Sequence, residues 1–172
     1  MNHSQSCPRW ALALSALLLA CPAQAAEAPR EVHGENSVFA SYGIAMAWGV
    51  LRGASEDETQ VVIRILPLGE AYAYLRIEGL DPFTQQRREV LPGQALGKGL
   101  DVRSPRATFA EFTRREIQFY TADDWPAGRP SLTIYYMGVP DTAPEFTSEA
   151  ALSKYLDDAL AKVRGQARGE KP

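Results

Sequence analysis

The chemistry that this sequence offers most clearly is anion binding by arginine, because basic residues gather in one central segment. Residues 82–115 hold seven basic side chains against three acidic ones, a net charge of +4, although the whole chain carries −3. A guanidinium group donates two parallel hydrogen bonds to a carboxylate or a phosphate. The residues that we expect to hold an anionic glycan or lipid head group are Arg87, Arg88, Arg103, Arg106, Arg114, Arg115, Tyr72 and Tyr74. The alternative interpretation is that the arginines pair with carboxylates across strands of their own domain.

Carboxylates are the candidate catalytic groups in this sequence, since a glycosidase needs two of them facing each other across about 5–10 Å. Asp123 and Asp124 precede Trp125, whose ring could stack on a sugar. Adjacent residues usually point apart, however, and a solvated loop with Trp125 packed under Pro126 is the competing interpretation. The acidic run at 56–58 offers oxygen ligands of the type that calcium prefers, although a charged hairpin tip has the same composition.

Histidine and cysteine chemistry is nearly absent beyond the first 25 residues. Cys7, Cys21 and His3 all lie in that segment, so His33 is the one imidazole that remains. A serine triad needs a histidine, a thiol nucleophile needs a cysteine, and zinc sites need three or four such ligands. The glycine-rich run at 93–99 lacks the length and the Ser/Thr of a P-loop. We therefore expect no metal and no cofactor, and the composition favours a binding protein over an enzyme.

The first 25 residues have the pattern of an export signal. A positive charge precedes the apolar run Trp10–Ala20, which is too short to span a bilayer, and Ala23–Ala25 is a small-x-small cleavage site. Leu18–Cys21 also resembles a bacterial lipobox, in which the cysteine is acylated, although Pro22 is an awkward neighbour for that cleavage. The sequence thus predicts a periplasmic or secreted protein, with a lipid on Cys21 and attachment to the outer membrane as the alternative.

Length and charge limit the architecture and the partners. Without the leader, the 172-residue chain retains enough residues for one domain with a full hydrophobic core. We expect a signal peptide at 1–25, a flexible segment at 26–36, a single domain at 37–165 and a polar tail at 166–172. The slightly negative net charge argues against a nucleic-acid partner. No second long apolar run follows the leader, so contact with a membrane is expected only through the lipid anchor.

Alternating side chains predict mainly β-structure. From Val38 to Leu51 the even positions are mostly large and the odd positions mostly Ser, Gly or Ala, a period-two pattern typical of a strand with two different faces. We expect the large face in the core and a close neighbour on the small face. Further strands are predicted at 60–66, 71–78, 85–91, 108–120 and 132–139, with a loop at 92–99. About seven short strands favour an antiparallel β-sandwich, Ig-like or related, while closure into a barrel stays open.

One amphipathic helix is predicted at 148–164, with a Ser or Thr N-cap at 147–148 and Gly165 as its end. Its apolar residues recur at helical spacing and form one stripe, whereas charged residues such as Asp157 are expected to face water. The stripe needs cover. The small face of the strand 38–51 is the expected seat, with an open sheet edge or another protein as the alternatives.

These observations lead to three functional hypotheses. The first is an exported bacterial envelope protein that acts by binding, as an accessory or assembly factor for another envelope component. The second is a binder of an anionic ligand through the arginine-rich strands at 82–115. The third is a carboxylate-based hydrolase that uses Asp123 or Asp124 with a distant acid. The first implies an envelope protein partner, and the second implies a glycan or a lipid head group.

Overall fold

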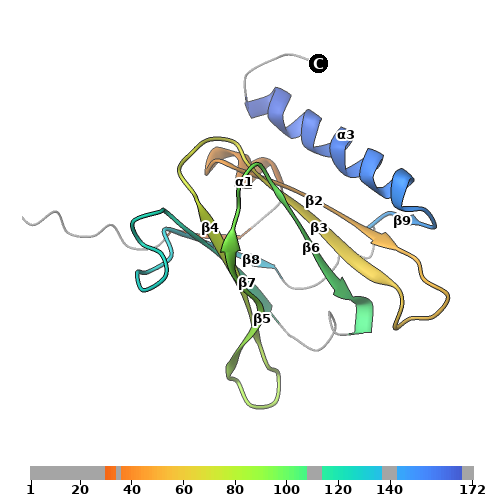
Figure 1. Ribbon diagram of the computed structural model, residues 1–172, viewed down its shortest axis with the longest axis horizontal. Helices are drawn as coiled ribbons and strands as arrows, with labels where there is room; N and C mark the ends of the chain where they lie inside the picture. Colours follow the sequence, from red (N-terminus) through yellow and green to blue (C-terminus); the bar gives the residue numbers. More distant parts are fainter. Residues whose placement is uncertain (1–29, 34–35, 108–113, 137–142, 168–172) are drawn as a thin grey trace, which may run out of the picture.

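The chain folds into a β-sandwich of two sheets, with a helix on the outside of one of them (Figure 1). The structure is a computed structural model that describes residues 30–33, 36–107, 114–136 and 143–167. The five-stranded sheet has the order β1-β8-β7-β4-β5, and the four-stranded sheet has the order β6-β3-β2-β9. The predicted sandwich with a C-terminal helix is confirmed.

Most neighbouring strands in both sheets are antiparallel. The strands are β1 (Arg30–His33), β2 (Ile44–Leu51), β3 (Gln60–Pro67), β4 (Tyr74–Leu80), β5 (Arg87–Ala95), β6 (Leu100–Pro105), β7 (Arg114–Tyr120), β8 (Leu132–Tyr136) and β9 (Glu145–Phe146). The helices are α1 (Asn36–Ser41) and α3 (Glu149–Ala167). Two short strands pair in parallel, β1 with β8 and β9 with β2, and each lies at the end of its sheet.

The main core lies between the two sheets. The large face of β2 supplies Ile44 and Met46, and β4 supplies Leu75 and Ile77 from the opposite sheet; all four are fully buried. Arg76, between the two inward residues of β4, lies on the outer face and bonds to the neighbouring strand. This alternation is the pattern that the sequence predicts for the large face of β2, and the expectation is confirmed.

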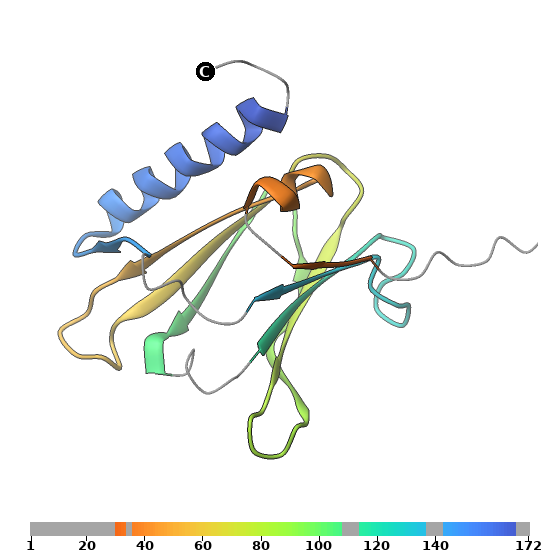
Figure 2. The ribbon, with the colours of Figure 1, turned by 180° about the vertical axis from the view of Figure 1, so that it is seen from behind.

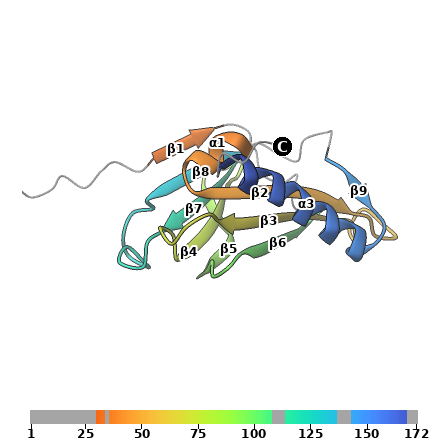
Figure 3. The same ribbon diagram turned by 90° about the horizontal axis from the view of Figure 1, so that it is seen from above.

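Helix α3 forms a third layer, on the outer face of the four-stranded sheet (Figures 2 and 3). Its apolar stripe packs on the small side chains of β2 and on one residue of β3, and the residues of this contact are Leu152, Leu156, Leu160, Val163, Ala45, Ala47 and Val62. A Cβ atom at Gly49 would lie 2.6 Å from the Leu152 Cδ1 atom. The helix is therefore seated on the small face of β2, as expected, and its Ser148 N-cap accepts a hydrogen bond from the Ala151 amide.

The prediction of one strand over 38–51 is wrong for its first part. Residues Asn36–Ser41 form α1, and β2 begins only at Ile44. Gly43 has a φ of +83°, and its amide donates to the Ala40 carbonyl over 3.0 Å. A glycine in this left-handed conformation ends a helix readily because it has no Cβ atom. Gly43 is thus a helix cap, although the alternation placed it on the small face of a strand.

The structure also differs from the sequence expectation at several element ends. Residues 30–33, within the segment expected to be flexible, form β1 because β8 offers an unpaired edge. Strand β5 continues to Ala95 through the expected loop at 92–99, and Pro92 is tolerated there because β5 is an edge strand. Gly165 lies inside α3, which runs on to Ala167.

Three strands were not anticipated as such: β1, β6 and β9. The two shorter ones, β1 and β9, carry too few residues for a period-two pattern to be visible. The leader at 1–25, residues 108–113 of one predicted strand and the end of another at 137–139 lie outside the described residues.

The close seat of α3 gives a first testable prediction. Replacing Gly49→Val places two methyl groups into the contact with Leu152, and we expect this overpacking to lower the free energy of unfolding by about 1–3 kcal/mol. Gly69→Val is the matched control, because a Cβ atom at Gly69 meets nothing within 4 Å. Urea unfolding of both variants checks the prediction, and equal midpoints for the two would contradict it.

Candidate binding groove

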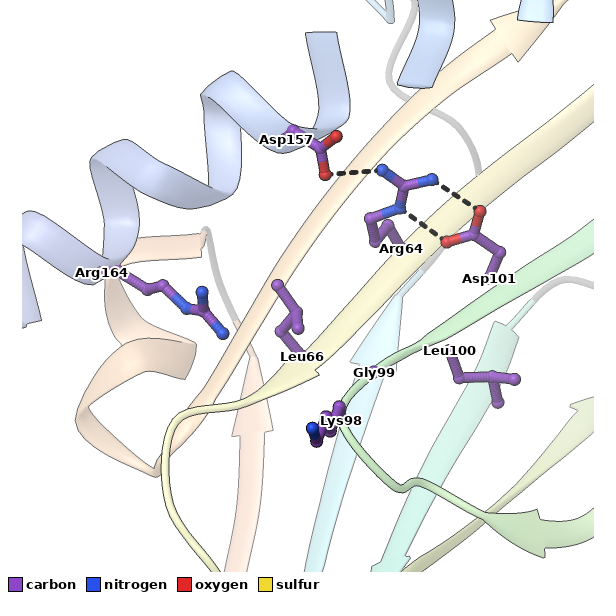
Figure 4. A pocket seen from close by; sticks show the side chains of 8 residues that line it. All are labelled: Arg64, Leu66, Lys98, Gly99, Leu100, Asp101, Asp157 and Arg164. Atoms are coloured by element: carbon purple, nitrogen blue, oxygen red, sulfur yellow. Dashed lines mark hydrogen bonds and ion pairs between the residues drawn. The ribbon is translucent and has the colours of Figure 1, made fainter. Parts of the chain in front are cut away.

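A groove lies between α3 and the outer face of the four-stranded sheet (Figure 4). Its volume is about 470 Å³, which lies within the range of small-molecule sites. The lining residues come from β3, the β5–β6 turn, β6 and α3, and they are Arg64, Leu66, Lys98, Gly99, Leu100, Asp101, Asp157 and Arg164. Three of the eight are basic and two are acidic, so the groove carries a small excess of positive charge.

Arg64 is held in place by carboxylates from two layers of the protein. Its Nε atom donates to Asp101 Oδ1 over 2.7 Å, and its Nη2 atom donates to Asp101 Oδ2 over 2.8 Å. Its Nη1 atom donates to Asp157 Oδ1 over 2.8 Å. The guanidinium group thus ties β3 to β6 and to α3 (Figure 4). Asp157, expected to face only water, is one of the groups that fix the helix.

Arg64, Asp101 and Asp157 together are called the Arg64 clamp below. The pKa values within this clamp follow from its hydrogen bonds. The bond from Arg64 is the main reason why the pKa of Asp101 lies below its ordinary value of 3.8. The same bond raises the pKa of Arg64 further above its ordinary value. The Arg64 side chain is 17 % exposed and that of Asp101 26 %. Nη1 and Nη2 also donate to Ser153 over 3.3 Å, so Arg64 shapes the groove wall rather than offering a vacant donor.

Lys98 and Arg164 are the two basic residues of the groove that take no part in the clamp. Both are exposed, and neither has an ion-pair partner among the residues that the structure describes. Lys98 lies in the turn before β6, and Arg164 extends from the last turns of α3 towards Leu66 (Figure 4). The arrangement offers two cationic donors with an apolar side chain beside them, which suits a small anion that carries an apolar part.

Gly99 shapes the sheet side of the groove. It has a φ of +140°, and a Cβ atom there would lie 2.7 Å from the Leu66 Cδ2 atom. Any side chain at this position would press against the apolar part of the wall. The turn therefore needs glycine both for its backbone conformation and for the close approach of Leu66.

Four of the arginines predicted to bind an anion lie on the five-stranded sheet, away from the groove. Arg87 and Arg114 both donate to Glu116, over 3.2 and 2.9 Å, and the Glu116 side chain is 3 % exposed. Arg88 lies 3.8 Å from Asp81. Arg115 is 2 % exposed and forms a hydrogen bond with Tyr136. Burial raises the pKa of Tyr136 to about 12. The alternative interpretation therefore holds for Arg87 and Arg88, which pair with carboxylates of other segments, whereas Arg114 pairs within its own strand and Arg115 is buried.

Of the remaining two predicted arginines, Arg103 belongs to β6 and Arg106 directly follows its last residue, and both pair with other elements. Arg103 of β6 makes a two-pronged ion pair with Glu149 at the start of α3, and Arg106 donates to Glu145 of β9 over 3.1 Å. Arg103 also lies 3.8 Å from Asp101. The structure therefore spreads the six arginines over two sheets and does not bring them together into one surface.

The two predicted tyrosines lie on opposite faces of the five-stranded sheet. Tyr72 packs against the core, with its ring 5.6 Å from that of Phe119. Tyr74 lies on the outer face and stacks on Trp125 at 5.2 Å. They were expected to share a face with Arg76, but β4 begins only at Tyr74, so the alternation does not extend back to Tyr72.

The Asp123–Trp125 segment is a structured loop. Asp124 Oδ2 accepts hydrogen bonds from Thr121 over 2.8 Å and from Ser131 over 2.9 Å, which closes the loop on itself. Trp125 folds onto the sheet, and a Cβ atom at Gly93 would lie 1.6 Å from the Trp125 ring. Asp124 thus acts as a structural acceptor, while Asp123 is exposed.

The possible metal ligands do not converge. Glu58 of the acidic run accepts a hydrogen bond from the Ala54 amide, and Glu56 lies 4.0 Å from Arg106. Residue His33 is part of β1, in register with Tyr135. In the described part of the chain, no three His, Cys, Asp or Glu side chains are grouped closely enough to hold a metal ion.

Comparisons with known proteins give no relative for this chain: no family model, no curated protein and no solved structure matches it. Within the described residues, none of the helices combines the length and the apolarity needed to cross a membrane.

Most of the groove lining was not predicted from the sequence. Lys98 is one of the basic residues of 82–115, but no pattern marked Arg64 or Arg164 as a site residue, and Asp157 was expected to face water. One signal was available: Arg64 is the one charged residue in the apolar run 61–66 of a central strand. A charge at such a position needs a partner from a neighbouring element.

The Arg64 clamp predicts a pH effect on stability. Because its pKa is lowered in the folded state, Asp101 contributes stability above pH 3.8, and this contribution is lost as the pH falls through the folded-state pKa. Arg64→Met should lower the free energy of unfolding by about 1–3 kcal/mol at neutral pH. It should also make that energy less dependent on pH in the acid range.

Urea unfolding from neutral pH to about pH 3 checks both effects. Lys154→Met is the control, since it removes an exposed ion pair with Asp158 on the same helix. The account of the clamp fails if Arg64→Met and Lys154→Met give the same stability and the same pH dependence.

Proposed function

We propose that this protein is an exported binding protein that takes a small anionic ligand in the groove between α3 and the four-stranded sheet. The observation that carries the proposal is that one groove cation has partners inside the protein and two have none that the structure describes. The donors of Arg64 are taken up by Asp101, Asp157 and Ser153, whereas Lys98 and Arg164 line the same groove without a carboxylate partner in the described chain.

The ligand class follows from the lining. Lys98 and Arg164 suit a carboxylate, sulfonate or phosphate group, and the Arg164 fork can bind it through two hydrogen bonds. Leu66, together with the hydrocarbon stems of the two cations, offers apolar contact to the rest of the molecule. Asp101 and Asp157 both form ion pairs with Arg64, so they repel a bound anion less than carboxylates without a cationic partner would.

The geometry supports this site better than the two alternatives from the sequence. The arginines at 87, 88, 103, 106 and 114 already have acidic partners. The carboxylate of Asp124 accepts two hydroxyl hydrogen bonds, which fits a loop support rather than an acid or a base in hydrolysis.

The place of action is part of the proposal and rests on the leader. The apolar run at 10–20 and the cleavage pattern at 23–25 support export to the periplasm or beyond, and Cys21 supports a lipid-anchored form as the alternative. In that setting the protein meets anionic metabolites and lipid head groups of the envelope.

The experiment that tests the proposal uses 8-anilinonaphthalene-1-sulfonate, a fluorescent sulfonate with an apolar body. We expect saturable binding by the wild-type protein, weakened by added salt because both cations are exposed. The double variant Lys98→Ala/Arg164→Ala should bind about tenfold more weakly, because each exposed charge pair contributes up to about 1 kcal/mol.

The double variant Lys154→Ala/Lys162→Ala is the matched control. Both lysines are exposed on α3 and lie outside the groove lining, and their loss changes the net charge by the same amount. Equal affinities of the two double variants would contradict the proposal, provided that both retain the thermal midpoint of the wild type.

A further inference from the structure

A second feature, independent of the groove, is the hairpin that joins β4 and β5. It extends beyond the body of the sandwich (Figures 1 and 2). Its turn satisfies its own backbone groups: Asp81 Oδ1 accepts from the amides of Phe83 and Thr84 at 2.9 Å each, and the Asp81 carbonyl accepts from the Gln85 amide at 3.0 Å. The tip is therefore held in one conformation by its own hydrogen bonds.

Phe83 is at this tip and is 93 % exposed. Within the described chain, the next most exposed large apolar side chain is Tyr155, at 38 %, and its ring packs against Phe146. Phe83 contributes its amide to the turn but nothing to the core. A phenylalanine is thus presented to solvent by a turn that would form equally well with a polar residue at that position.

The surroundings of Phe83 decide what kind of partner fits it. The neighbouring side chains of Thr84, Gln85 and Gln86 are uncharged, polar and exposed. The nearby cations are paired inside the domain, Arg87 with Glu116 and Arg88 with Asp81. An anionic bilayer would be met by a cluster of basic residues without acidic partners, and the cations near the tip do not form one.

An exposed aromatic residue followed in the turn by uncharged polar side chains has the composition of a protein interface, where a central aromatic anchor carries much of the binding energy and a polar rim surrounds it. A rigid turn adds affinity because little conformational freedom is lost on binding. We propose that the β4–β5 hairpin is a docking element and that Phe83 inserts into an apolar pocket of a protein partner in the envelope.

The experiment is photo-crosslinking in intact cells that produce the full chain. Phe83→p-benzoylphenylalanine keeps an aromatic side chain at the tip, and Gln86→p-benzoylphenylalanine places the same group on the same turn. We expect a protein adduct from position 83 that is absent or much weaker from position 86. Mass spectrometry identifies the adduct, and titration of the purified partner then measures its affinity.

The proposal is decided by how tightly the Phe83 and Gln86 variants bind the purified partner, compared with the wild type. Phe83→Ser should weaken the complex by about 30-fold or more, the loss typical of an aromatic anchor at an interface. Gln86→Ser should leave it unchanged, and the thermal midpoints of both variants should match the wild type, since neither side chain lies in a core cluster.

The other outcomes overturn the proposal. An adduct with lipid alone would make the tip a membrane contact, and an adduct with a second copy of this chain would make it a self-association site. Equal labelling from positions 83 and 86, no adduct at all, or a partner whose affinity survives Phe83→Ser would each remove Phe83 as an anchor.

Discussion

The close contact of α3 with β2 is the constraint on which the rest of this structure depends. Helix and strand meet across alanine and glycine, so close that a Cβ atom at Gly49 would lie 2.6 Å from Leu152. This approach places the helix near enough for Asp157 to reach Arg64 on β3, and Arg64 in turn binds Asp101 on β6. The groove exists because these three elements are fixed relative to one another. Without the small face of β2, neither the clamp nor the position of Arg164 would follow.

Much of this arrangement could be predicted from the sequence, because it rests on strong and local patterns. The two faces of β2 and the stripe of α3 each repeat several times, and together they identify both layers and the contact between them. Their ends were predicted less well. Gly43 and Gly165 look alike in a sequence, yet Gly43 has a positive φ and caps α1, whereas Gly165 lies within α3. Which of the two ends a helix depends on tertiary packing that no local pattern reports.

The candidate site was the least predictable part, and the reason is electrostatic. A sequence shows where arginines are concentrated but not which of them have partners. The arginines that looked most available already have acidic partners, as Arg87 of β5 and Arg114 of β7 do in Glu116. The two groove cations that have no carboxylate partner in the described chain, Lys98 and Arg164, come from segments 66 residues apart and meet only through the seat of α3. Together with the exposed Phe83 on its hairpin, they suggest a protein with one surface for a small anion and another for a protein partner.

The most direct test of the central claim is to locate the anion by nuclear magnetic resonance, using 8-anilinonaphthalene-1-sulfonate and isotope-labelled protein. The account predicts that the largest shifts of backbone amide signals fall on Lys98–Asp101 and on the second half of α3, with little change on the five-stranded sheet. Shifts centred on the arginines of β5 and β7, or spread evenly over both sheets, would contradict it. Either of these results would mean that the groove between α3 and the four-stranded sheet is not the binding site.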